Sequence, residues 1–225
     1  MSSFEILMTE TKVSRGKFLS TPILKHVIEK GIDRPLYLAY LEQAYHHVKE
    51  TCPLLAAAAS RCTSYDSIYQ QALFDYIGEE KGHEFWILDD IQNLGGDIIN
   101  IRHGQGDETV RIMVGYARYA IDHISPYSLL GMVHVLEGMS VILADKAAKA
   151  IMQSNELSDG KGFSYLTSHG ALDQEHVKFF ENLINKIDDP ETLNVIIDSA
   201  NIIYRLFGEM FNALDPNMES QPNVI

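Results

Sequence analysis

Three side chains near residue 170 have the types and the spacing of metal ligands. His169, Asp173 and His176 lie at positions i, i+4 and i+7. A helix turns by about 100° per residue, so the three positions fall within about 60° of one another on one helix face. By composition, His-x3-(Asp/Glu)-x2-His should occur by chance in only ~0.05 of chains of this size. One helix can therefore present three ligands, although surface histidines beside a capping carboxylate give the same pattern.

A second candidate site lies in the acidic segment 79–84. Glu80 and His83 have the Glu-x-x-His spacing with which di-iron carboxylate bundles hold a metal, and Glu79 is an alternative ligand. The same spacing is common on solvated helix faces, and the motif by itself favours that simpler interpretation. Gly82 inside a helix costs about 1 kcal/mol relative to alanine, which indicates close packing or a local irregularity.

A third candidate is Glu137, which lies in the otherwise apolar stretch 131–139. A lone ionised carboxylate is costly to bury, so we expect Glu137 to be paired or coordinated. The alternative to a metal is a buried ion pair with an arginine such as Arg118. His134 lies on the same face. We expect it to hydrogen bond to a ligand, or to be a core histidine with satisfied hydrogen bonds, rather than to be a ligand itself.

The adjacent His46 and His47 can direct only one imidazole inward. His47 is the better candidate because Leu36 and Tyr40 lie along a similar stripe. We expect His47 near the site, as a neighbour of the ligands or an alternative ligand.

Three helices together offer enough ligands for two metal ions. Their mixed oxygen and nitrogen donors, without thiolate, suit iron or manganese, whereas a structural zinc site is closed by four ligands that commonly include cysteine. Positions for O2 and a substrate then remain open, and redox chemistry is the natural use of such a site. The expected ligands are Glu80, His83, Glu137, His169, Asp173 and His176.

The charge of the chain limits its partners. Its 225 residues include 18 Lys and Arg against 31 Asp and Glu, a formal net charge of −13, which excludes nucleic acid as a primary partner. Cys52 and Cys62 are too few for a disulfide framework, and we expect both to be reduced and buried. Residues 1–12 lack the pattern of a signal peptide, and the longest apolar run, 54–59, is too short to cross a membrane. We expect a cytoplasmic protein with no membrane insertion.

The elements that must position these side chains are helices. Apolar residues recur every three to four positions, and prolines, capping residues and glycines mark the boundaries. Strand-like alternation is limited to 98–101, within a glycine-rich connection at 95–106. We expect one all-α domain, 1–225, a bundle of about seven helices with an N-terminal arm at 1–20 and a frayed tail at 215–225. The predicted helices are 21–31, 36–61 with a kink or offset at Pro53, 67–94, 109–124, 125–152, 163–187 and 191–214.

Several of these segments resemble a known family. The segment from Tyr165 to His176, together with Glu137 and the segments 45–49 and 60–62, is similar to the CADD-like proteins, named for a chlamydial protein associating with death domains. That family belongs to the haem-oxygenase-like di-metal oxidases, which are seven-helix bundles on the scaffold of thiaminase II and pyrroloquinoline-quinone synthase. They bind two irons in place of haem. The resemblance spans most of the chain and implies the same fold.

The resemblance also implies the ligand set given above, position by position. One departure is the compact Glu80-Lys81-Gly82-His83, which looks more like the alkene-forming fatty-acid decarboxylases of the same superfamily and leaves Glu79 and Glu80 as alternatives. CADD-like proteins consume one of their own tyrosines, but segment 21–30 contains none, so that activity is not carried over. Tyr40 and Tyr45 remain as candidate catalytic groups near the expected pocket.

The implied reaction is an O2-dependent oxidation. Two ferrous ions, or manganese, would reduce O2 to a bridged peroxide that abstracts hydrogen from a small organic substrate or cleaves a C–C bond. Fatty-acyl and amino-acid-like substrates both fit, and a homodimer is expected for this scaffold. The candidate wall residues are Phe85, Trp86, Met132 and Met139, although ordinary core packing is the favoured role for each.

Two other functions remain open from the sequence. A metal-free hydrolase of the thiaminase II type would need a cysteine nucleophile and would give no reason for the stripe that ends at His176. A non-enzymatic interaction module would keep its binding activity after the loss of His176. The oxidase would lose its metal and its turnover.

Overall fold

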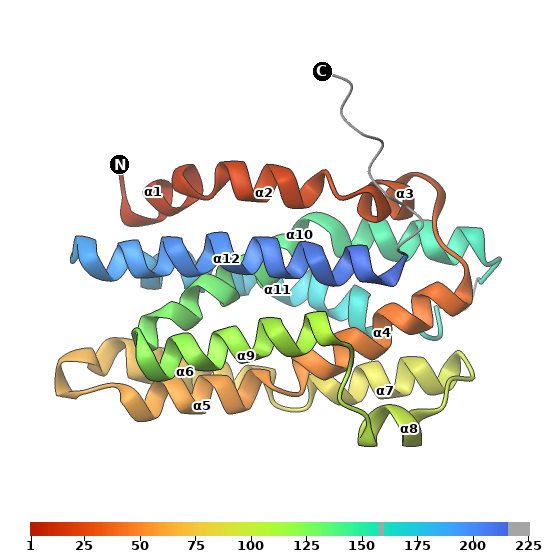
Figure 1. Cartoon of the computed structure of the whole chain (residues 1–225), viewed down its shortest axis with the longest axis horizontal. Helices are drawn as coiled ribbons and strands as arrows, with labels where there is room; N and C mark the ends of the chain where they lie inside the picture. Colours follow the sequence, from red (N-terminus) through yellow and green to blue (C-terminus); the bar gives the residue numbers. More distant parts are fainter. Residues whose placement is uncertain (158–159, 216–225) are drawn as a thin grey trace.

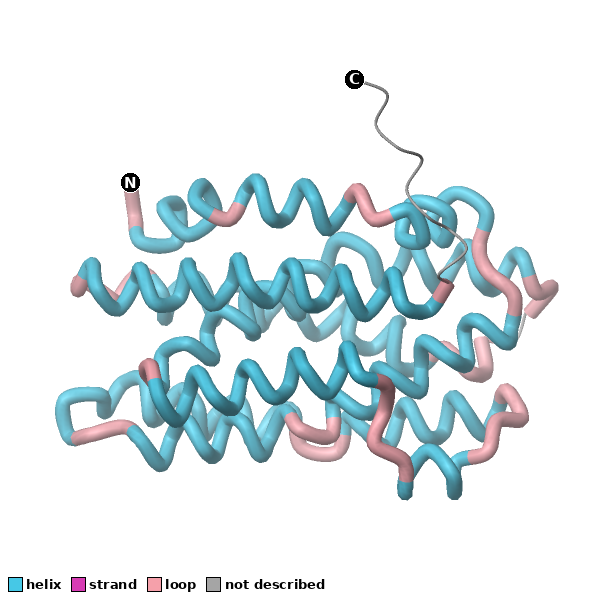
Figure 2. The backbone as a smooth tube through the Cα atoms, in the orientation of Figure 1, coloured by secondary structure: helices cyan, strands magenta, loops and turns pink. Residues whose placement is uncertain are grey.

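A computed structural model describes residues 1–157 and 160–215 of the chain, except for the side chains of residues 169–175. Helices dominate this described part, which contains no strand (Figure 2). The helices are α1 (Ser3–Glu10), α2 (Lys12–Leu19), α3 (Pro22–Lys30), α4 (Arg34–Val48), α5 (Thr51–Arg61), α6 (Ser67–Glu80), α7 (His83–Asn93), α8 (Ile98–His103), α9 (Glu108–His123), α10 (Leu129–Ser154), α11 (Ser164–Ile184) and α12 (Pro190–Leu214), with 3₁₀ turns η1 (Ser64–Asp66) and η2 (Pro126–Ser128).

The long helices α10, α11 and α12 form the centre of the bundle. α10 packs against α3, α11 and α12, and α12 also contacts α2 and α9. In Figure 1, α12 runs along the long axis of the molecule between the N-terminal helices α1–α3 and the green helix α9. The remaining helices complete the bundle through the pairs α4 with α7, α5 with α6 and α5 with α9.

The interior consists of two clusters of buried apolar side chains. One cluster, which includes Leu73, Met113 and Leu130, joins α5, α6, α9 and α12 to the first half of α10. The other, which includes Tyr37 and Ile87, joins α3, α4, α7 and the start of α11 to the second half of α10. α10 therefore links the two halves of the core.

The segment Pro126–Ser154, which contains α10, is long and apolar enough to cross a membrane, and no other described helix is. Its most apolar window has a mean hydropathy of 1.5, and half of that window is buried inside the bundle. A core helix has the same length and composition, because it too must be apolar on several faces.

Several predicted helix starts are confirmed, together with their physical cause. Asp33, Asp107 and Asp189 each accept a hydrogen bond from the backbone N–H three residues later, at the starts of α4, α9 and α12. These bonds satisfy N–H groups that have no partner within the helix. Prolines occupy the first turns of α3, α4 and α12, where a missing N–H costs nothing.

The structure has more helices than the seven expected, partly because the predicted helix 36–61 is two helices. The break lies at Lys49 and Glu50, three to four residues before Pro53, where a proline disturbs the preceding turn and where the predicted kink or offset therefore falls. Pro53 lies in the first turn of α5, which tolerates proline.

The predicted helix 67–94 is also two helices, α6 and α7. Between them, Gly82 has φ +98°, a left-handed conformation that glycine adopts readily and other residues adopt with strain. Glu80 is the last residue of α6 and His83 the first of α7. The expectation that both lie on one continuous helix is therefore wrong.

The ends of the chain and the predicted connection differ from expectation as well. Residues 98–101 belong to the short helix α8, which Asp97 caps through the N–H groups of Ile99 and Asn100. The expected N-terminal arm consists of α1 and α2, whose buried Leu7 and Phe18 belong to the core. Of the predicted tail 215–225, residues 216–225 lie outside the described part of the chain.

Candidate metal centre

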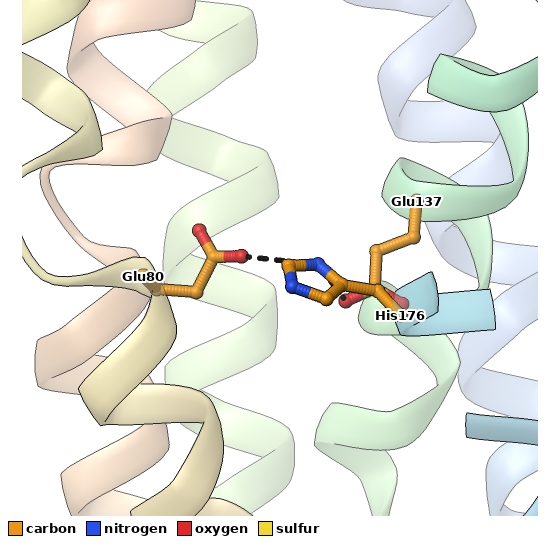
Figure 3. Close-up of side chains that lie close together, drawn as sticks. All are labelled: Glu80, Glu137 and His176. Atoms are coloured by element: carbon orange, nitrogen blue, oxygen red, sulfur yellow. Dashed lines mark ion pairs between the residues drawn. The ribbon is translucent and has the colours of Figure 1, made fainter. Parts of the chain in front are cut away.

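Glu80, Glu137 and His176 converge inside the bundle from α6, α10 and α11 (Figure 3). One potential ligand atom from each residue lies within 4.8 Å of the others. Glu80 is 9% exposed and His176 is 7% exposed, and the Glu137 side chain is largely buried. Two carboxylates and one imidazole in a buried cluster are the donor chemistry of an iron or manganese site.

His176 is the centre of this cluster. Its Nδ1 atom lies 3.7 Å from Oε1 of Glu80 and 3.8 Å from Oε1 of Glu137. Its Nε2 atom lies 3.2 Å from Oε2 of Glu79, whose side chain is 52% exposed. Both glutamates that the sequence left as alternatives therefore contact His176, and only the Glu80 side chain is buried.

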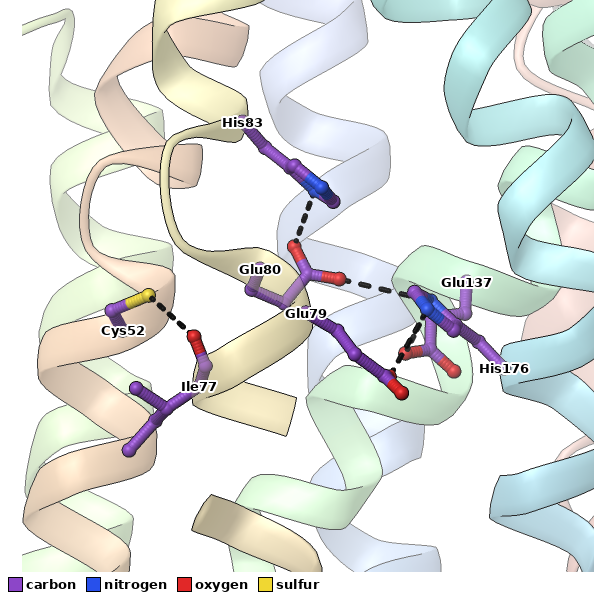
Figure 4. A network of polar contacts seen from close by, with 7 residues as sticks. All are labelled: Cys52, Ile77, Glu79, Glu80, His83, Glu137 and His176. Atoms are coloured by element: carbon purple, nitrogen blue, oxygen red, sulfur yellow. Dashed lines mark hydrogen bonds and ion pairs between the residues drawn. The ribbon is translucent and has the colours of Figure 1, made fainter. Parts of the chain in front are cut away.

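His83 contacts the same carboxylate from the other side. Its Nδ1 atom lies 3.0 Å from Oε2 of Glu80, and the ring of Trp86 stacks on its imidazole at 4.1 Å between centroids. Figure 4 shows Glu80 between His83 and His176. A carboxylate held by two imidazoles has a fixed orientation, which is how proteins align metal ligands.

The helix that carries His176 is anchored at its first turn by a residue of α7. The Asp90 carboxylate accepts hydrogen bonds from the backbone N–H groups of Ser164 and Tyr165, at 2.9 and 2.8 Å, and from Oγ of Ser164 at 2.8 Å. The N-cap residue of α11, Phe163, makes no side-chain capping bond. Asp90 thus caps α11 from a neighbouring helix.

The other two predicted ligands of α11 are His169 and Asp173, and their side chains lie outside the described residues. Both positions belong to α11, seven and three residues before His176. Their role as ligands stays a prediction.

His134 does not join the metal cluster. Its Nε2 atom lies 3.4 Å from the hydroxyl of Thr11. Its ring stacks on Phe180 and makes a T-shaped contact with the ring of Tyr204. Burial, with a smaller effect of Arg15, lowers the pKa of His134 to about 4. His134 is therefore a neutral core histidine in this structure.

The ion pair considered between Glu137 and Arg118 does not form. The guanidinium of Arg118 instead donates to the carboxylate of Asp122 at 3.1 Å, one turn later on α9, and both side chains are exposed. Glu137 has the His176 imidazole as its neighbour.

A cavity of about 160 Å³ adjoins the cluster, and its lining is mostly apolar. Met132 and Met139 belong to its wall, although the sequence favoured ordinary core packing for both. Phe85 is 53% exposed and Trp86 stacks on His83, so neither is a wall residue. The lining contains the titratable or hydroxyl-bearing side chains of Tyr40, His47, Thr51, Tyr76, Glu80, Glu137, Ser140 and Tyr165.

Two other candidate residues differ in position. Tyr40 lines the cavity, whereas Tyr45 does not. The ring of Tyr45 instead lies 5.3 Å from Nζ of Lys49 in a cation–π contact. His47 lines the cavity, as expected of a residue near the site, and its Nδ1 lies 3.2 Å from the carbonyl of Gln43.

The sequence analysis missed Tyr76 and Ser140, which line the cavity beside the ligands. Tyr76 lies four residues before Glu80, and Ser140 lies three residues after Glu137. Positions three or four apart share a helix face, so this spacing was the signal that could have revealed them.

Residues 38–208, which contain all three clustered residues, match the family model of iron-containing redox enzymes. The chain belongs to this family. No curated protein matches the sequence. The match establishes the iron-containing redox family, and the CADD-like subgroup stays a prediction.

Solved structures show the same fold at low sequence identity. A domain of unknown function with a haem-oxygenase-like fold from Shewanella denitrificans superposes with a TM-score of 0.85 at 16% identity, over 96% of this chain and 93% of that one. A TenA homologue from Pseudomonas syringae superposes with a TM-score of 0.79 at 8% identity, over 93% of this chain and 91% of that one. Haem oxygenase-1 from the cyanobacterium Synechocystis, solved with haem, superposes with a TM-score of 0.74 at 16% identity, over 97% of this chain and 94% of that one. The all-α, haem-oxygenase-like fold is thereby confirmed.

Proposed function

We propose that this protein is a non-haem, O2-dependent oxidase that binds two iron ions and oxidises a small organic substrate. The observation that carries the proposal is the convergence of Glu80, Glu137 and His176 beside an apolar cavity. Membership of the iron-containing redox family supports it.

The donor set fits iron. Carboxylate oxygens and imidazole nitrogens without thiolate suit iron and manganese, and Glu80, Glu137 and His176 present them together. His83, His169 and Asp173 complete the proposed set of six ligands for two ions. Iron bound there would supply the electrons that reduce O2.

The residues of the chain would balance the charge of the metal ions, hold the ligands in place and exclude water from the site. The carboxylates of Glu80 and Glu137 would compensate the charge of the bound cations, and the hydrogen bond from His83 would hold Glu80 in place. The apolar cavity wall would keep bulk water away from a reactive site and bring the substrate next to it.

The cysteines argue against the metal-free hydrolase. Neither Cys52 nor Cys62 is among the residues that line the cavity. Burial raises the pKa of Cys52, and it raises the pKa of Cys62 to about 11, which opposes formation of a nucleophilic thiolate. Figure 4 shows Cys52 directed toward the carbonyl of Ile77 rather than toward the cluster. The likeness to the TenA homologue supports a shared fold.

The test is an anaerobic titration of the purified, metal-free protein with Fe(II), followed by exposure to O2. We expect uptake of about two irons per chain and a change in visible absorbance on exposure to O2. His176→Ala should lose both, whereas the control His103→Ala, at an exposed histidine on α8, should retain both. Uptake that is absent, or equal in the two variants, would contradict the proposal and favour a non-enzymatic interaction module.

A further inference from the structure

Tyr76 places a buried hydroxyl beside the proposed metal site. The side chain is 1% exposed and lines the cavity, and its ring meets the edge of the His176 imidazole at 6.2 Å between centroids. Its Oη atom has no hydrogen-bond partner in the described part of the chain. Buried hydroxyls are nearly always hydrogen-bonded, so this hydroxyl is available to a molecule that enters the cavity.

Ser140 provides a second hydroxyl of the same kind. It lies on α10, nearly one turn after Glu137, and lines the same cavity. Its Oγ atom is buried, and among the described residues it has no hydrogen-bond partner. A serine in a helix commonly bonds to the carbonyl four residues earlier, as Ser20 does with Gly16, but Ser140 does not. Two unsatisfied donors therefore flank Glu137.

The cavity beyond these hydroxyls is long and apolar. Its lining follows one face of α10 from Leu129 to Ile151, a length of about 33 Å at 1.5 Å per residue. From Ser140 to Ile151 the path measures about 16 Å by the same rise. Leu143, Ala144 and Ala147 form this arm together with apolar side chains of α3.

The hydroxyl groups in the arm itself are already satisfied. Tyr40 and Tyr165 line it and hydrogen bond to each other through their side chains. Along the arm a ligand therefore meets mostly apolar surface, and the buried cavity-lining hydroxyls without a partner among the described residues are those of Tyr76 and Ser140.

The charges around the cavity restrict the polar group. The described lining contains no lysine and no arginine, and it contains the carboxylates of Glu80 and Glu137. An anionic group would meet like charges without a compensating side chain. A phenol and a serine hydroxyl can instead donate to an uncharged acceptor oxygen.

We propose that Tyr76 and Ser140 bind the uncharged oxygen of an elongated apolar substrate, a hydroxyl or carbonyl, and so place the adjoining carbon beside Glu80, Glu137 and His176. The assignment rests on the proposed function, since it concerns the substrate of the same site. Tyr76 and Ser140 are positioning residues here, because they fix the substrate and leave the chemistry to the metal site.

The experiment is calorimetric titration of the metal-free protein with four ten-carbon probes: decanol, decane, decanoate and decylamine. The variants are Tyr76→Phe and Ser140→Ala. The control Tyr69→Phe removes another buried phenol of α6, two turns earlier, whose hydroxyl donates to the carbonyl of Pro126 and does not line the cavity. Thermal unfolding of each variant checks that the fold is intact.

Decanol should bind the wild type more tightly than decane or decanoate. Tyr76→Phe and Ser140→Ala should each weaken decanol binding by about 3- to 10-fold, the effect of one net hydrogen bond, and should leave decane binding unchanged. Tyr69→Phe should affect none of the probes.

Three results would overturn the assignment. One is a loss for decane or decylamine on Tyr76→Phe as large as the loss for decanol. Another is tighter binding of decanoate or decylamine than of decanol, and the third is no binding of any probe. Because these titrations contain no metal, such a failure is distinct from a failure of the iron titration, which tests the proposed function.

Discussion

Ionisable side chains buried in the bundle avoid the cost of an isolated buried charge in two different ways. Glu80, Glu137 and His176 lie together, so that each charge has a neighbour of opposite or coordinating character. His134 lies among Phe180, Tyr204 and Thr11 and avoids the cost of burial by staying neutral. The first arrangement can hold a cation, and the second contributes to stability alone.

The neutral His134 should make the protein sensitive to acid. Its folded pKa of about 4 lies below the ordinary value of 6.5, so the unfolded chain binds the proton more readily. The stability of the fold should be complete above pH 6.5 and should fall as the pH drops toward 4, by up to about 3 kcal/mol from this residue. Urea unfolding between pH 7.5 and 4 should show a smaller decline for His134→Gln.

His46 adds to the same effect, because burial lowers its pKa to about 4 as well. His134→Gln should therefore reduce the acid-dependent loss without abolishing it. His103→Gln, at an exposed position, should leave the pH profile as it is in the wild type. A profile for His134→Gln identical to that of the wild type would show that this histidine is not the cause.

Among the helices, α11 depends on α7 for its first turn. Asp90 of α7 satisfies two backbone N–H groups and one hydroxyl of α11, and α7 also supplies His83. α7 is thus connected to α11 through Asp90, and to Glu80 at the end of α6 through His83.

Removal of this cap should weaken both stability and metal binding. Asp90→Ala leaves buried N–H groups of Ser164 and Tyr165 without acceptors, and we expect a loss of about 2 to 3 kcal/mol in the free energy of unfolding. Fe(II) affinity should also fall, because His176 is on the helix that loses its anchor. Urea unfolding and Fe(II) titration measure the two effects.

The neighbouring Asp89 is a matched control, since it is exposed on the same helix. Asp89→Ala should change the free energy of unfolding by less than about 0.5 kcal/mol. Equal losses for Asp89→Ala and Asp90→Ala would contradict the anchoring role of Asp90.

Across the whole molecule, the bundle depends on the close approach of α10 and α12. A Cβ atom added at Gly131 would lie 2.6 Å from the backbone nitrogen of Ala200 and 2.8 Å from the carbonyl oxygen of Ile196. Backbone atoms of a packed helix cannot move locally, so the two helices would have to separate.

Gly131→Ala should therefore destabilise the fold by about 3 kcal/mol through overpacking. Gly138→Ala on the same helix should instead be neutral, or stabilising by up to about 1 kcal/mol, since nothing lies within 4 Å of the added Cβ and alanine favours a helix. Thermal unfolding of the two variants tests the difference. A similar Tm for both would mean that the contact between α10 and α12 does not limit stability.

From the sequence, the helical class, most helix starts and the single candidates Glu137 and His176 could be predicted, whereas the shared helix expected for Glu80 and His83 was wrong. Glu137 within an apolar stretch and the stripe that ends at His176 were recognisable because helix periodicity involves only residues a few positions apart. Asp189 before Pro190 marked a helix start for the same reason, since this cap bonds to an N–H three residues away.

The tertiary structure alone decided which of these side chains meet. Asp90 and Ser164 lie 74 positions apart in the chain, and no local pattern indicates their hydrogen bond. The same holds for the contact of His134 with Thr11 and for the cavity between Tyr76 and Ser140. Even the break at Gly82 needed the fold, because glycine permits a left-handed turn without requiring it. The different partners of the two helices, α5 for α6 and α4 and α11 for α7, select the turn. Periodicity is a property of neighbours in the chain, whereas a site is a property of neighbours in space.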